Sequence, residues 1–156
     1  KEYQKIGISS FLCANMLYSP SYVSFESALG YYGLIPERVY EYCSACFQKK
    51  KKKFKNELGI FTYRYIPQNV FWCEIIKENS ENGNFLIAKP LKSLFDFIFI
   101  RKKNYENIND IEEDLRIELS SLKEILVPYM AKEIFNLSSL YRRNNINEFA
   151  KMLIKK

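Results

Sequence analysis

The sequence predicts an α+β domain: short N-terminal helices, then a mostly antiparallel sheet, then a helical C-terminal segment. Three observations predict this fold. Stretches rich in β-branched and aromatic residues fill the middle of the chain, links of hairpin length join them, and apolar residues at helical spacing fill the last third. The chain has 156 residues, 47% of them hydrophobic and 16% aromatic, which is enough for a single domain with its own core.

The N-terminal part is predicted to hold two short helices. Residues 9–17 place apolar side chains at helical spacing, and Pro20 ends this helix. Residues 22–23 are briefly extended. Ser24 suits the N-cap of a second helix, and Gly33 suits the left-handed position just beyond its end.

The middle of the chain is predicted to form a sheet of at least four strands, joined mostly by hairpins. The strands are expected over residues 39–47, 60–66, 71–76 and 85–88, with a turn at 78–84. The lysine run that follows the first strand is expected to form a basic hairpin, because charge runs are usually solvated.

The last third is predicted to be helical. Pro90 suits the first position of a helix that carries an apolar stripe. Lys92 and Asp96 are spaced to pair on the surface of this helix, a contact worth only a few tenths of a kcal/mol. Further helices are expected over residues 109–117, 119–126, 129–136 and 146–154, with a break at Asn144 and Asn145.

The composition excludes several kinds of chemistry. The chain has no histidine, so it contains neither a Ser-His-Asp triad nor a histidine metal ligand. Cys43 and Cys46 form a CxxC pair, but in a predicted strand residues three apart point to opposite faces. Glu74 and Lys77 have the same spacing, which does not fit the converging carboxylates and lysine of a metal-dependent nuclease. We therefore expect no enzymatic activity, no metal and no cofactor.

The composition also bears on location. The longest uncharged stretch, residues 6–25, contains five serines, Pro20 and Asn15, which is too polar for a membrane span. Four cysteines in a chain of this length do not resemble a disulfide scaffold. We expect a cytoplasmic protein that makes no membrane contact.

The net charge of +6 is concentrated in the first third of the chain. Residues 1–56 carry nine basic and four acidic side chains, whereas residues 106–156 carry eight basic and nine acidic ones. Such a basic surface binds nucleic-acid phosphates or an acidic partner, or it is a solvated edge that prevents aggregation. The candidate binding residues are Lys49, Lys50, Lys51, Lys52, Lys53 and Lys55, together with Arg64, Lys102 and Lys103.

One stretch resembles a known family. Residues 19–37 read SPSYVSFESALGYYGLIPE, which is similar to the signature of AbiEi-type antitoxins from type IV toxin–antitoxin (abortive infection, phage defence) systems. Two weaker matches follow in the same order, GIFTYRYI at 59–66 and IAKPLKSLFD at 87–96. The resemblance covers about residues 10–102. Lys89, Ser93 and the long lysine run depart from the family pattern.

The resemblance implies a fold and a function. Family members have an N-terminal winged-helix DNA-binding domain followed by a domain of this kind, so residues 1–156 are expected to be the C-terminal antitoxin domain alone. It would counter an AbiEii-type nucleotidyltransferase toxin and contribute to transcriptional autoregulation in bacteria. The alternative is a charge-driven nucleic-acid-binding module of a transcriptional regulator, with DNA as its partner.

Overall fold

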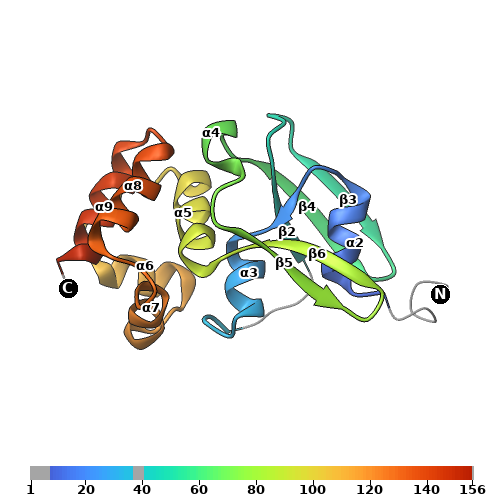
Figure 1. Cartoon of the computed structure of the whole chain (residues 1–156), viewed down its shortest axis with the longest axis horizontal. Coiled ribbons are helices and arrows are strands. Elements are labelled where there is room, and N and C mark those ends of the chain that lie inside the picture. The colour runs from blue at the N-terminus through green and yellow to red at the C-terminus, as the bar shows by residue number, and fades with distance from the viewer. Residues whose placement is uncertain (1–7, 37–40, 156) are drawn as a thin grey trace.

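The computed structural model describes residues 8–36 and 41–155 of the chain. Six strands form one sheet in the order β3-β4-β2-β1-β6-β5, with helices on both of its faces and a helical group beyond it (Figure 1). This is the α+β fold that the sequence predicts. The strands are β1 (Tyr22–Val23), β2 (Glu41–Cys46), β3 (Lys52–Asn56), β4 (Gly59–Tyr65), β5 (Ile75–Ser80) and β6 (Gly83–Ala88).

The sheet is mixed, so the expectation of a mostly antiparallel sheet is not confirmed. The pairs β1–β2, β3–β4 and β5–β6 are antiparallel, whereas β2–β4 and β1–β6 are parallel. After β2 the chain crosses to the edge strand β3 and returns as β4 between the two. The consecutive strands β2 and β3 therefore do not pair with each other. The expected basic hairpin is not confirmed either, because the run occupies this crossing and the edge strand itself.

Helix α2 (Ser10–Leu17) covers one face of the sheet (Figure 1). Ser9 caps it by accepting a hydrogen bond from the backbone N–H of Phe11. Leu12 packs with Phe61 in a cluster of buried residues, and the Tyr63 hydroxyl donates to the carbonyl of Ala14. These contacts fix α2 against the middle of the sheet.

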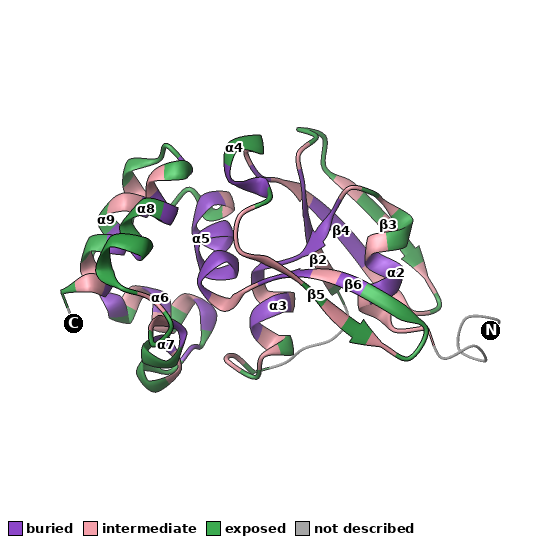
Figure 2. Cartoon of the chain, in the orientation of Figure 1, coloured by how far each residue is buried: buried purple, intermediate pink, exposed green. Residues whose placement is uncertain are grey.

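Helices α3 (Phe25–Tyr31) and α5 (Pro90–Arg101) pack against each other as part of a second buried cluster. Gly33 follows α3 with φ of +71°, and Pro90 is the first residue of α5, as the sequence predicts. Residues 91–99 are all buried, so most of α5 is enclosed (Figure 2). A helix buried on all sides lies in the interior of a fold, and α5 here joins the sheet to the helices that follow.

The C-terminal helices are α6 (Ile108–Leu115), α7 (Leu119–Leu126), α8 (Ala131–Leu140) and α9 (Asn144–Ile154). A capping box between Asn107 and Asp110 begins α6, two residues before the predicted start. The expected break at Asn144 and Asn145 is wrong, because these residues form the first turn of α9.

One predicted strand is partly wrong. Helix α4 (Gln68–Phe71) ends the stretch that follows β4, and β5 begins only at Ile75. Val70 and Phe71 are completely buried, and the Phe71 ring lies 4.9 Å from that of Tyr22. A short apolar run looks the same in a buried strand and in a buried helical turn, so packing decides between them.

Candidate functional site

The predicted lysines lie at one edge of the sheet. Lys49, Lys50 and Lys51 are exposed in the connection after β2, and Lys53 and Lys55 are exposed on β3. Lys52 points to the other face, where its ammonium lies 4.3 Å from the centre of the Tyr18 ring. The exposed lysines thus form a solvated strip at this edge of the sheet. We call it the basic strip, and it comprises Lys49, Lys50, Lys51, Lys53 and Lys55.

Arg64 lies on the same face of the sheet as the exposed lysines of β3. Lys53 is paired with Thr62 in the register, and Arg64 is two residues further along β4. Because side chains alternate along a strand, all three point to the same face. Lys53 and Arg64 are therefore diagonal neighbours, at a separation typically of about 7–8 Å.

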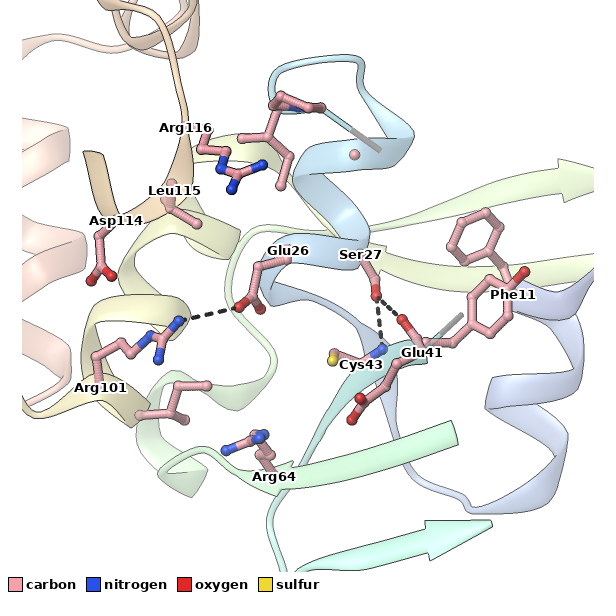
Figure 3. Close-up of a pocket in the computed structure, with 15 residues that line it drawn as sticks. Phe11, Glu26, Ser27, Glu41, Cys43, Arg64, Arg101, Asp114, Leu115 and Arg116 are labelled. Atoms are coloured by element: carbon pink, nitrogen blue, oxygen red, sulfur yellow. Dashed lines mark hydrogen bonds and ion pairs between the residues drawn. The ribbon is translucent and has the colours of Figure 1, made fainter. Parts of the chain in front are cut away.

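Arg64 also lines a cavity of about 570 Å³, which we call the arginine cavity (Figure 3). Arg101 from the end of α5 and Arg116 from the end of α6 reach the same space. Lys102 and Lys103 directly follow Arg101, so the structure brings Arg64 near this second predicted basic group, whereas the lysine run does not line the cavity. The other polar lining side chains are Glu26, Ser27, Glu41, Tyr42, Cys43 and Asp114.

The charges around the arginine cavity are unevenly paired. Arg101 forms a long ion pair of 3.8 Å with Glu26. Asp114 accepts a hydrogen bond of 2.6 Å from the Tyr105 hydroxyl and lies 4.0 Å from the ammonium of Lys103. Arg64 and Arg116 form no ion pair with a carboxylate among the residues that the structure describes. Within the described ranges, these two guanidinium groups therefore lack a carboxylate partner.

The sequence pattern does not single out Arg101 and Arg116 as candidate binding residues. Arg116 is the C-cap of α6 and has φ of +54°, in the left-handed region that glycine prefers. Lys102 has the same conformation at the end of α5. Only the meeting of three separate elements brings these side chains together. A basic residue at a helix C-terminus was the one available signal, and it is common for dipole reasons alone.

Cys43 lines the arginine cavity. Burial raises the pKa of its thiol to about 11, so the neutral thiol predominates at pH 7. All four cysteines are free, and Cys43 and Cys46 lie on β2 as predicted. No group of three potential metal-ligating side chains occurs within the described residues.

A second cluster of polar side chains surrounds Asp96 in the interior of the fold. The expected surface pair is completely buried: Lys92 donates to Asp96 Oδ1 at 2.9 Å, and both side chains are fully inaccessible to solvent. Tyr141 also donates to Oδ1 at 2.6 Å, while Tyr22 and Ser24 donate to Oδ2 at 2.8 and 2.7 Å. Four donors satisfy this carboxylate.

The side chain of Ser24 has a different hydrogen-bond partner from the one that the sequence predicts. It occupies the N-cap position of α3 as predicted, but its side chain makes no capping hydrogen bond and instead donates to Asp96. Lys92 also lies 4.9 Å from the Tyr141 ring centre. This network links β1, α3, α5 and the end of α8 in the interior of the fold.

Comparison of the chain with protein-family models finds no match, and comparison with curated proteins finds none either. Among the described residues, no helix has both the length and the apolar character needed to cross a membrane. The functional assignment therefore depends on the residues and their geometry.

Proposed function

We propose that this chain is the C-terminal domain of an AbiEi-type antitoxin, acting without catalysis in the cytoplasm against an AbiEii-type nucleotidyltransferase toxin. The observation that carries the proposal is the meeting of two segments that resemble the family. Tyr22 and Ser24 from the first segment donate to Asp96 from the third, 72 or more residues away along the chain. The segments thus form one buried unit.

The second segment supports the same interpretation. Residues 59–66 of the resemblance include all of β4, whose partners β2 and β3 flank it in the sheet. A resemblance spread over segments that pack into one unit is expected when those segments build a scaffold. The functional surface is then elsewhere, and we propose that it is the basic strip of β3 with Arg64, Lys102 and Lys103.

The test is a bacterial growth assay. The chain is co-expressed with a cognate AbiEii-type nucleotidyltransferase toxin, and restored growth is the expected result. Replacing the five lysines 49–53 by glutamine is expected to weaken the rescue, whereas the control K123Q/K132Q, on α7 and α8, is expected to retain it. If the chain does not restore growth, the antitoxin proposal is wrong.

A second function is favoured by the exposure of the lysines on an edge strand. Charge-driven binding of duplex DNA would weaken steeply with salt, by a slope of about 0.9 in log K per phosphate contact. The glutamine variant of lysines 49–53 is expected to lose this binding and its salt slope in a fluorescence anisotropy titration. Unchanged binding would mean that the basic strip does not contact the DNA.

A further inference from the structure

Beyond the antitoxin role, we propose that the arginine cavity binds a nucleoside phosphate, with the phosphate held by Arg64, Arg101 and Arg116. The inference does not depend on the family resemblance, because it uses only the shape and charge of the cavity. Its volume of about 570 Å³ is typical of sites for small organic ligands.

The charge balance favours an anionic group at the arginine side. Glu26 is paired with Arg101, and Asp114 is held by Tyr105 and Lys103. Two guanidinium groups, those of Arg64 and Arg116, then face the space without a carboxylate partner among the described residues. Guanidinium groups bind phosphate through paired hydrogen bonds, which makes arginine the side chain suited to this role.

The opposite side of the arginine cavity has a different character. Phe11 lies there, away from the three arginines (Figure 3), and its ring is 5.5 Å from that of Tyr42. Phe11 stacks on Phe85 and Tyr42 stacks on Phe61, so the two rings form an aromatic wall at this end of the cavity, against which a nucleobase can pack. A phosphate at one end and a base at the other together define a nucleotide.

Polar groups lie between these two sides. Glu41 is exposed, and its carboxylate has no hydrogen-bond or ion-pair partner among the residues described. Ser27 holds this part of β2 in place, since its hydroxyl donates to the Glu41 carbonyl at 3.3 Å and accepts from the Cys43 N–H at 2.8 Å. A carboxylate beside a nucleotide accepts hydrogen bonds from ribose hydroxyls, so we assign this contact to Glu41.

The nucleotide can be free or can be the phosphorylated end of a nucleic-acid strand. Lys53 and Arg64 share a face of the sheet, so the basic strip leads towards the cavity. A strand lying along β3 would have its end in the cavity, whereas a free nucleotide would use the cavity alone. Both sources present the same phosphate and base.

The test is calorimetric titration of the full chain with AMP, GMP, adenosine and inorganic phosphate. We expect saturable binding of a nucleotide, weakened at least tenfold in R64Q/R116Q. The matched control K123Q/K132Q removes the same charge outside the cavity and the basic strip, and is expected to change the dissociation constant less than twofold. E41Q is expected to weaken binding of the nucleotide but not of phosphate. Circular dichroism establishes that each variant is folded, and the single variants R64Q and R116Q replace the double variant if it is not.

A 5′-phosphorylated pentanucleotide and its unphosphorylated form identify the source of the ligand. Tighter binding of the phosphorylated strand than of AMP, lost in R64Q/R116Q, supports the site with a strand end as its ligand. Equal or weaker binding of the strand supports it with a free nucleotide. The proposal is overturned if no nucleotide or phosphorylated strand saturates at millimolar concentration, or if K123Q/K132Q weakens binding as much as R64Q/R116Q does.

Discussion

Lys92 and Asp96, one turn apart on α5, form an ion pair of 2.9 Å in which both side chains are completely buried. A buried pair of this kind stabilises a protein only when further hydrogen bonds compensate for the lost hydration. Here Tyr22, Ser24 and Tyr141 supply them. The polar interior between the sheet and the C-terminal helices is therefore satisfied, and removing one of its donors has a large cost.

Tyr141→Phe is expected to lower the free energy of unfolding by about 1.5–3 kcal/mol, since a buried hydrogen bond to a charged group is lost without a change of shape. Tyr31→Phe is the matched control. It removes an exposed hydroxyl that lies 3.5 Å from Glu78 and is expected to cost less than about 0.5 kcal/mol. Urea denaturation measures both. An equal decrease in the free energy of unfolding in both variants would mean that the hydrogen bond from Tyr141 to Asp96 stabilises the fold no more than an exposed one.

The stability of the fold is expected to decrease above about pH 10. Burial, with the charge of Asp96 as a second cause, raises the pKa of Tyr22 and Tyr141 well above 10. The stability that these two tyrosines contribute is fully present below a pH of about 10, the pKa of tyrosine in the unfolded chain. It is lost as the pH rises towards their pKa in the folded protein. Burial also raises the pKa of further tyrosines, namely Tyr32, Tyr63, Tyr105 and Tyr129.

Lys92 affects the pH dependence of stability in the opposite direction. Burial lowers the pKa of Lys92, so this one group increases the stability of the fold as the pH rises, whereas the six tyrosines named above decrease it. Urea unfolding at pH 8, 9.5, 10.5 and 11 should show the loss, with a shallower slope in Tyr141→Phe than in the wild type. A stability that rises over this range would contradict the assignment.

The lysines of β3 are expected to prevent association through the edge of the sheet. β3 pairs only with β4 among the described strands, and Lys53 and Lys55 are exposed on it. Charged side chains on an edge strand discourage pairing with a second copy. K53V/K55V should self-associate as its concentration rises, measured by light scattering after size exclusion. The control K49V/K50V changes the preceding connection and should stay unchanged, whereas similar association of both variants would contradict a role of the strand.

Arg116→Gly is expected to separate stability from ligand binding. The left-handed conformation at this C-cap costs roughly 1–2 kcal/mol for a residue with a Cβ, and glycine adopts it freely. Because glycine also loses more chain entropy and the dipole contact of arginine, the net free energy of unfolding should be unchanged or rise by up to about 1 kcal/mol. Nucleotide affinity should fall nevertheless. A variant that is destabilised by more than about 1 kcal/mol would mean that Arg116 is structural.

The sequence by itself determined the fold class, most helix positions and the exposure of the lysine run. These features depend on local chemistry: Pro90 begins a helix, Gly33 ends one, and side-chain periodicity marks the apolar faces. The lysines are solvated wherever the chain places them, because five adjacent charges cannot be buried.

Only the tertiary structure decided the sheet order, the burial of Lys92 with Asp96 and the grouping of the three arginines. Each depends on partners distant in sequence: Ser24 and Tyr141 reach Asp96 from opposite ends of the chain, and Arg64, Arg101 and Arg116 come from three elements. An i, i+4 pair has the same spacing on a surface helix and on a buried one. The difference comes from what packs around α5, which is a property of the whole fold rather than of any segment.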